Sequence, residues 1–481
     1  MTADRRPDPP GAPPAPDEFA HLLRRACAHA EQWRSAVAQQ PVFPPVDAAE
    51  LRRLLDADGL PEGPGDPDAV LDLLAHAGRI GSTASAGPRY FGYVIGSSSP
   101  VTVAADWLVS AWDQNAALYT CGPAVAVIEE VCARWVVDLL GLPPHTSVGF
   151  TTGTQMAAFT VLAAARQHLL ERRGWDVAAD GLWGAPRFPV IASAQRHATV
   201  DRALRYLGLG APTALVACGE DGTVDLGALR DALARAAGPA LVCVQAGNIH
   251  TGAVDPLGDV CELVHAHGGW VHVDGAIGLW ARASAAHGHL LDGVERADSW
   301  TVDGHKWLNV PFDCGVALTA HPAAHAAAMS STSAYVVPSG ERDPMETVPE
   351  WSRRARAVPV YAALRALGRS GVAELVDRAV ALARRMAARL AAHPGVLVLN
   401  DVVLNQVMVR FEAPGRDGDA LTREVVDRVQ REGTCWLADS RYGDRAVMRI
   451  SVCSYATDEA DVDRSAEAIV RALAAAVAAA A

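Results

Sequence analysis

The sequence predicts an α/β fold built on a mostly parallel seven-stranded sheet, with an N-terminal helical arm and a smaller C-terminal α+β domain. Two observations carry this prediction. From residue 147 onward, short and nearly all-apolar segments alternate with segments of helical periodicity, as in a sheet that is covered on both faces. After Pro338 the alternation gives way to a long helix followed by paired strands. The length of 481 residues also favours two or three domains over one.

The seven predicted strands are short, and several of them are almost entirely apolar. They are expected at 147–150, 189–193, 214–218, 240–245, 270–274, 299–302 and 314–319. Helices are expected between most of them, at 156–173, 200–207, 226–236 and 257–267. Ligands of such sheets bind beyond the carboxyl ends of the strands, so we expect a binding site there.

Around this sheet the chain divides into four predicted segments. Residues 1–16 are rich in proline and read as a disordered leader. Residues 17–110 have apolar positions at helical spacing and read as an arm that packs on a second subunit. Residues 111–358 form the large domain and 359–481 the small one. In the small domain we expect helices at 360–393, at 420–432 and after Thr457, with strands at 396–399, 406–411, 435–438 and 447–454.

Composition excludes several classes of protein. A net charge of −13 makes nucleic acid an improbable partner, because phosphate contacts need clustered Lys and Arg. The leader lacks the apolar core of a signal peptide, and apart from the alanine-rich C-terminus no apolar run reaches the ~18 residues of a membrane span. The nine cysteines are scattered without a Cys-x-x-Cys pair, so we expect a cytoplasmic protein. His265, His267 and His272 are interpreted as structural, and no metal site is predicted.

Polar residues that could bind a ligand or take part in a reaction follow the predicted strands. At 151–154 a glycine and three threonines connect a strand to a helix, where free backbone N–H groups and hydroxyls suit a phosphate, although ordinary helix capping has the same pattern. Asp274 closes a very apolar strand, so its carboxylate requires a cationic partner, either a ligand or an arginine, unless it caps a helix. His197 could stack on a flat ring or serve only as a bonded loop histidine, and Lys306 could be a nucleophilic amine or a surface lysine.

The joint pattern is more specific than its parts. The segment 291–315, containing Asp303-Gly304-His305-Lys306-Trp307, resembles the signature of the group II pyridoxal phosphate (PLP)-dependent amino acid decarboxylases, the family of aromatic amino acid, histidine and glutamate decarboxylases. The similarity extends to 88–93, 122–124 with Glu129, 272–276, 352–354 and 449–453. The resemblance implies PLP-dependent transferase fold type I, PLP as cofactor, and a homodimer with active sites at the subunit interface.

The resemblance also implies roles for individual residues. Lys306 is expected to form the Schiff base, Asp274 to pair with the pyridine nitrogen, and His197 to stack on the ring. The full set of expected cofactor-binding residues is Thr154, Gln155, His197, Gln245, Asp274, Ala276, Asp303, His305 and Lys306. The implied reaction is decarboxylation of an L-amino acid to an amine and CO2 through an external aldimine and a quinonoid.

Four departures from the family pattern bear on this function. Gln155 and Gln245 replace smaller or hydroxyl residues, and Asp303 stands where many members have asparagine. Residues 339–352 contain no tyrosine, although family decarboxylases commonly use one there to protonate the carbanion; Tyr335 is the only tyrosine between 320 and 350. Two alternatives therefore stay open. One is other PLP carbanion chemistry, namely oxidative decarboxylation–deamination, C–C or C–S lysis or transamination, and the other is a non-catalytic binding protein. Tyr93, Tyr119 and Tyr335 are the candidate substrate contacts, and the sequence does not identify the amino acid.

Overall fold

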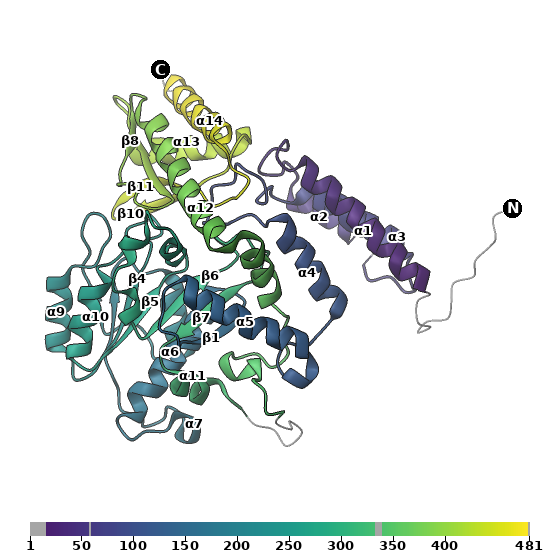
Figure 1. Cartoon of the computed structure of the whole chain (residues 1–481). Coiled ribbons are helices and arrows are strands. Elements are labelled where there is room, and N and C mark those ends of the chain that lie inside the picture. The colour runs from purple at the N-terminus through teal and green to yellow at the C-terminus, as the bar shows by residue number, and fades with distance from the viewer. Residues whose placement is uncertain (1–15, 57–58, 332–338, 480–481) are drawn as a thin grey trace.

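The fold is described from a computed structural model for residues 16–56, 59–331 and 339–479. A large body carries a central sheet, a smaller C-terminal layer sits on top of it, and the N-terminal helices project to one side (Figure 1). None of the helices in these three ranges combines the length and the apolar character that crossing a bilayer requires.

The central sheet contains the seven predicted strands, each within two residues of its expected bounds. They are β1 (Ser147–Thr151), β2 (Val190–Ser193), β3 (Ala214–Val216), β4 (Leu241–Gln245), β5 (Trp270–Asp274), β6 (Ser299–Asp303) and β7 (Gly315–Thr319), in the order β1-β7-β6-β5-β4-β2-β3. Only β7 runs antiparallel to its neighbours, which confirms the mostly parallel sheet. Because Gly315 pairs with both Thr151 and Asp303, the carboxyl ends of β1 and β6 meet at the same edge.

Helices cover both faces of this sheet, as its alternating side chains require. Leu241 and Cys243 of β4 pack in a core with α6 and α8, whereas Val242 and Val244 pack with α5, α9, α10 and α12. The helices of this region are α5 (Pro123–Leu139), α6 (Thr154–Glu171), α7 (Val177–Asp180), α8 (Ala198–Tyr206), α9 (Leu226–Arg235), α10 (Leu257–Ala266) and α11 (Pro322–Met329), with short 3-10 turns η1 (Tyr119–Cys121), η2 (Gly278–Ala283), η3 (Gly288–Leu291), η4 (Val294–Arg296) and η5 (Pro344–Thr347).

The C-terminal part is the predicted α+β layer. Its antiparallel sheet has the order β10-β11-β9-β8. Its elements are α12 (Ala357–Ala391), which is broken at Gly368 (φ 62°), β8 (Val396–Val398), β9 (Gln406–Phe411), α13 (Gly418–Glu432), β10 (Ala438–Tyr442), β11 (Arg445–Ser451) and α14 (Glu459–Ala478).

One predicted strand of this layer is misplaced. The strand expected at 435–438 begins only at Ala438. The apolar residues before it are buried for another reason, because the backbone of Trp436 bonds to Arg89 and Phe91 of the segment that follows the arm. The strand itself is polar because β10 lies at the edge of its sheet.

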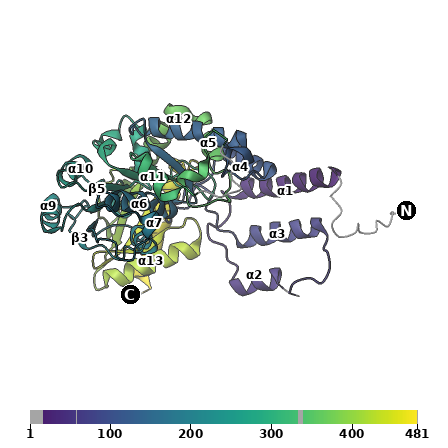
Figure 2. The same cartoon turned by 90° about the horizontal axis from the view of Figure 1, so that it is seen from below.

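The N-terminal helices form a separate layer beside the body. They are α1 (Pro16–Ala36), α2 (Ala48–Leu55), α3 (Pro67–Gly81) and α4 (Pro100–Trp112). The first three project together away from the rest of the chain (Figure 2). Asp72 of α3 bonds to Arg25 and His29 of α1, so the two helices are joined by ionic contacts. The predicted domain boundaries stay predictions, and residues 1–15 of the expected leader lie outside the described residues.

Candidate active site

A cavity of about 220 Å³ lies where the strands β1, β2, β4, β5 and β6 end. All nine expected cofactor-binding residues line it, although they come from distant parts of the sequence. Gly153 of the predicted phosphate turn also lines it, and Thr199, Gly247, Ile249 and Ile277, for which the sequence predicted no role, complete the lining. Thr199, two residues after His197, was the one whose position gave a signal, because a hydroxyl there can bond to the histidine ring.

The turn between β1 and α6 is tightly packed. Thr154 N–H donates to Asp303 Oδ1 at 2.7 Å, whereas the buried Thr154 Oγ1 has no hydrogen-bond partner among the described residues. Gly153 and Gly315 allow the close approach here, because a Cβ on Gly315 would lie only 2.4 Å from the Gly153 carbonyl carbon. The turn therefore offers a helix N-terminus and an unused hydroxyl to the cavity.

Asp303 and Lys306 form an ion pair at the end of β6. Lys306 Nζ lies 3.1 Å from Asp303 Oδ2, and His305 Nε2 lies 3.7 Å from Oδ1. Burial opposes ionisation of Asp303, but Lys306, His305 and the Thr154 N–H together hold the pKa of this carboxyl below its usual range. Burial lowers the pKa of His305 despite the attraction of Asp303. The lysine is thus held in the cavity wall by an ionised partner.

Asp274 closes β5 and is 7% exposed. Its Oδ1 accepts from Ala276 N–H at 3.1 Å. In the part of the chain that the structure describes, no Arg, Lys or His side chain forms an ion pair with it, so the alternative of an arginine partner is not realised. A nearly buried carboxylate without a protein cation requires a cation from a ligand.

His197 is both a cavity residue and the N-cap of α8. Its Nδ1 accepts from Thr199 N–H at 3.3 Å and lies 2.9 Å from Thr199 Oγ1. Gln155 supports the same turn, because its Nε2 donates to Thr199 O at 3.4 Å. Burial lowers the pKa of His197, while Asp274 opposes that shift. In the neutral ring the proton therefore sits on Nε2, since Nδ1 is an acceptor.

Gln245 ends β4 directly beside Asp274 on β5. Its backbone N–H donates to Asp255 Oδ2 at 2.7 Å, while its side-chain Nε2 is buried with no partner among the described residues. Asp255 also accepts from Val224 N–H, and burial raises the pKa of Asp255 to about 6 against these two bonds. This carboxylate fixes the backbone from which the Gln245 amide reaches the cavity.

Arg449 lies next to the cavity, although the sequence indicated it only as part of the 449–453 stretch of family similarity. It lies on β11 of the small domain, is 8% exposed, and donates from Nε to Ile249 O at 3.0 Å. Its buried Nη2 has no partner among the described residues, and burial lowers its pKa to about 10. The positive charge of Arg449 contributes to the lowered pKa of His197. The small domain therefore brings a guanidinium close to the cavity residues of the large domain.

The three tyrosines expected at the substrate lie elsewhere or are not described. Tyr93 is exposed and its ring packs on Trp436 with 5.2 Å between ring centroids. Tyr119 N–H donates to Asp343 Oδ1 at 2.7 Å, and neither tyrosine lines the cavity of this chain. Tyr335 lies outside the described residues. Substrate contacts for all three stay predictions.

The histidines excluded as metal ligands have separate partners. His265 bonds to Asp298, His267 Nδ1 to Leu263 O, and His272 to Ser299. The described residues contain no group of three or more His, Cys, Asp or Glu side chains arranged to hold a metal ion.

With this geometry in place, comparison with known proteins identifies the family. The family model described as "Pyridoxal-dependent decarboxylase conserved domain" matches residues 50–412. The chain belongs to this family. The chain is 27% identical to the aromatic-L-amino-acid decarboxylase of Bacillus atrophaeus, over 85% of this chain and 86% of that one. It is equally 27% identical to the 4-hydroxyphenylacetaldehyde synthase of Rhodiola rosea, with 90% of each chain covered.

A solved structure supports the same assignment. The chain superposes on Oryza sativa TDC, crystallised with PLP and tryptamine, with a TM-score of 0.89 and 26% identity over 96% of this chain and 99% of that one. The fold is therefore PLP-dependent transferase fold type I. The protein is a PLP-dependent carboxy-lyase by family, and PLP is its cofactor.

The residues of the cavity fit PLP. The unpartnered Thr154 Oγ1 and Gln245 Nε2 are buried polar atoms that a ligand would satisfy. The helix N-terminus at Thr154 suits a phosphate, Asp274 suits a protonated ring nitrogen, and Lys306 is an amine within the same wall.

Proposed function

We propose that the protein converts an L-amino acid into the corresponding amine and CO2. The observation that carries this proposal is the convergence of Lys306, Asp274 and His197 on one cavity, in which no cationic side chain of the described residues forms an ion pair with Asp274. When bound, PLP supplies an electron sink for the bond that breaks at the substrate carbon.

We assign Lys306 to covalent attachment of the cofactor and Asp274 to keeping its ring nitrogen protonated. His197 and Ala276 would hold the ring between them, and the unpartnered Gln245 amide would hold a polar ring substituent. Thr154, Gln155 and His305, which surround the start of α6, would bind the phosphate. Asp303 would orient Lys306 through the 3.1 Å ion pair.

Arg449 is the group we assign to the substrate carboxylate. Its Nη2 is a buried donor that lacks an acceptor among the described residues, and a carboxylate accepts well from a guanidinium. Binding the carboxylate beside the cavity would orient the bond to CO2. Exchange for glutamine should raise KM for the amino acid more than it lowers cofactor affinity.

A second outcome, oxidative decarboxylation to an aldehyde, is favoured by one specific observation. Formation of an amine needs a proton at the substrate carbon that loses CO2, and residues 339–352 lack the tyrosine that family decarboxylases commonly use. In the alternative reaction, O2 and water are consumed and an aldehyde, CO2, ammonia and hydrogen peroxide are released. A relative of similar identity carries the name of an aldehyde synthase.

Product analysis distinguishes the two reactions. The PLP-loaded enzyme is incubated with a panel of L-amino acids, and CO2, amine, aldehyde, ammonia, peroxide and oxygen uptake are measured, with Lys306→Ala as control. We expect CO2 and amine in equal amounts without oxygen uptake. Equal amounts of aldehyde and peroxide would select the oxidative reaction. Absence of any product, together with no borohydride-trapped cofactor on Lys306, would select the non-catalytic alternative.

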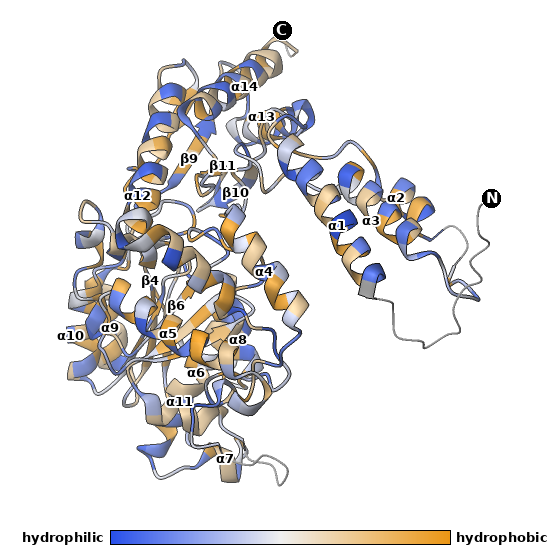
Figure 3. Ribbon diagram, turned by 45° about the vertical axis from the view of Figure 1, so that its right-hand side comes forward, coloured by the Kyte–Doolittle hydropathy of each residue, from blue (hydrophilic) through white to orange (hydrophobic). Residues whose placement is uncertain are grey.

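We propose that the enzyme is a homodimer, with parts of each active site supplied by the partner subunit. Support comes from the projecting arm, where Phe19, Leu23 and Leu74 are exposed by 55%, 47% and 57%. Figure 3 shows hydrophobic segments, in orange, along these projecting helices. On α4, Trp107 and Trp112 are likewise exposed. Such apolar surface is typical of an oligomer interface. Light scattering at micromolar concentration should give twice the chain mass, and a fully active monomer would refute the proposal. A cytoplasmic location stays a prediction from the scattered cysteines.

A further inference from the structure

Asn309 occupies an unusual position in the turn that carries Lys306. It follows the lysine by three residues, is 1% exposed, and has a positive φ of 56°. This left-handed conformation is unfavourable for most residues with a side chain, but asparagine tolerates it better than most others. A buried polar residue in this conformation persists only where its surroundings hold it in place.

The side chain of Asn309 uses its full hydrogen-bonding capacity. Its Oδ1 accepts from Ser97 N–H at 3.1 Å and from Tyr455 N–H at 2.9 Å. Its Nδ2 donates to Trp307 O at 2.8 Å and to Cys453 O at 3.0 Å. An amide has two donors and two acceptor lone pairs, so all four are occupied.

The backbone of Asn309 adds contacts to the same neighbours. Its N–H donates to Lys306 O at 3.2 Å, and its own carbonyl accepts from Ser99 N–H at 3.0 Å. Gly96 packs closely on the same carbonyl, because a Cβ on Gly96 would lie 1.9 Å from Lys306 O. The carbonyl of Lys306 is therefore contacted both by Gly96 and by the Asn309 N–H.

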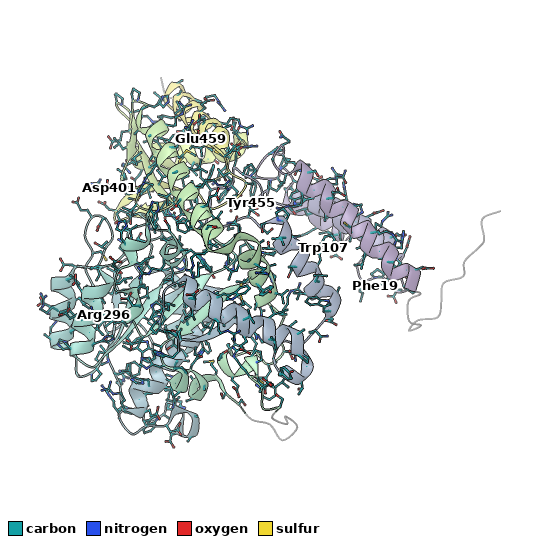
Figure 4. All side chains as sticks on the ribbon, viewed as in Figure 1. Phe19, Trp107, Arg296, Asp401, Tyr455 and Glu459 are labelled. Atoms are coloured by element: carbon teal, nitrogen blue, oxygen red, sulfur yellow. The ribbon has the colours of Figure 1, made fainter. Side chains whose placement is uncertain are left out.

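These bonds join three parts of the chain that are distant in sequence. Ser97 and Ser99 precede α4, Lys306 lies between β6 and β7, and Cys453 and Tyr455 lie between β11 and α14. Figure 4 shows Tyr455 where the C-terminal layer meets the N-terminal helices. Asn309 is thus the point at which the small domain and the segment before α4 both contact the lysine turn.

We infer that Asn309 is a positioning residue that fixes the direction of the Lys306 amine. With the Lys306 carbonyl held by the Asn309 N–H and packed against Gly96, the Lys306 side chain starts from one defined orientation toward Asp303 and the cavity. A displacement of about 1 Å at a reacting group can lower a rate about 10²-fold. The inference rests on the proposed attachment of the cofactor to Lys306.

Two variants separate positioning from a merely structural contribution. Asn309→Gly keeps the left-handed backbone accessible but removes all four side-chain bonds. Asn309→Asp keeps the shape and the two acceptor contacts but loses the two donor contacts to Trp307 O and Cys453 O. The matched control is Asn405→Ala. Asn405 is equally buried and donates to Val452 O at 2.9 Å and to Cys453 Sγ, but no bond joins it to the lysine turn among the described residues.

Three quantities are measured for each variant: PLP affinity by quenching of tryptophan fluorescence, the rate of borohydride-trapped attachment mapped to Lys306 by peptide mass, and kcat with KM. Asn309→Gly should attach PLP to Lys306 and turn over about 10- to 100-fold more slowly, with PLP affinity and KM within about threefold of the parent. Asn309→Asp should show the same pattern in smaller degree. Asn405→Ala should lower the melting temperature while leaving attachment and kcat within about twofold.

Attachment and kcat within about twofold of the parent in both Asn309 variants would overturn the inference, as would an equal loss in Asn405→Ala. If Asn309→Gly fails to fold, Asn309→Asp decides alone. Failure of the proposed function is distinguishable, because then the parent protein itself would show no adduct at Lys306.

Discussion

The buried ion pair between Glu129 and Arg353 gives the sharpest quantitative prediction. The Glu129 and Arg353 side chains are 1% and 0% exposed, and Arg353 Nη1 lies 2.8 Å from Glu129 Oε2. Arg353 also donates to Ala116 O at 3.0 Å and to Phe150 O at 2.7 Å. The last bond holds β1 just before the turn that lines the cavity. The perturbation is Glu129→Gln, which keeps the shape of the side chain and removes its charge.

The expected loss of stability follows from the burial of the two side chains and the distance between them. At 2.8 Å the attraction is about 6 kcal/mol for an effective dielectric constant of about 20. Desolvation of the two ions offsets most of this in the parent, so the pair itself contributes little net stability. Removal of one charge leaves the buried guanidinium with only the two carbonyls and the neutral amide. We therefore expect the free energy of unfolding to fall by about 3–5 kcal/mol.

The assay is urea unfolding followed by tryptophan fluorescence, with linear extrapolation to water. Because Arg353 holds Phe150 O, we also expect weaker binding of PLP in Glu129→Gln. The neighbouring Arg354 provides the control. The Arg354 side chain is 40% exposed and pairs with Asp106 at 2.8 Å, so Arg354→Gln should lower the free energy of unfolding by less than about 1 kcal/mol.

Equal losses in Glu129→Gln and Arg354→Gln would refute the reasoning, because the argument depends on burial and not on the presence of an ion pair. A loss below about 1 kcal/mol in Glu129→Gln would do the same. Arg353→Met tests the pair from the other side and should lose at least as much, because the carbonyls of Ala116 and Phe150 then lack a donor as well.

Three further predictions concern the site and the sheet. Asp274→Asn should lower kcat about 10²- to 10³-fold, because a neutral amide no longer stabilises a protonated ring nitrogen; an unchanged kcat in steady-state assays at saturating PLP would contradict its assigned role. Gly96→Ala should destabilise the protein by about 1–3 kcal/mol, since the added Cβ would lie 1.9 Å from Lys306 O; a melting temperature equal to that of the parent would show that the two segments can separate. Asp298, bonded to His265 and His321, should contribute pH-dependent stability. The bond to Asp298 raises the pKa of His265, so the contribution is lost as the pH rises through the pKa of His265. Burial opposes ionisation of Asp298, but its histidine partners lower its pKa, so the contribution is also lost as the pH falls through the pKa of Asp298. The difference in unfolding free energy between the parent and Asp298→Asn should be largest between about pH 4 and 6.5, and a difference that does not change from pH 4 to pH 9 would contradict this assignment.

The sequence predicts much of the fold because strands and helices leave local signals. The apolar runs that end in Gln245 and in Asp274 mark buried strands without reference to any other part of the chain. The same locality explains the misplaced strand, because Cys435, Trp436 and Leu437 are as apolar as a strand but are buried against residues 89–91, which no local pattern reveals.

The candidate site divides in the same way. Motifs around Lys306, Asp274 and His197 indicated the family, the cofactor and nine of the residues that line the cavity. Only the tertiary structure brings Arg449 against Ile249 of the cavity wall and Asn309 against the backbone of Lys306. Arg449 comes from a strand of the second domain, and the importance of Asn309 lies in bonds to Ser97 and Cys453, far away on either side in the sequence. Composition and spacing report what a segment does with its own backbone, whereas these contacts exist only after separate segments have packed together, so they were decided by the tertiary structure.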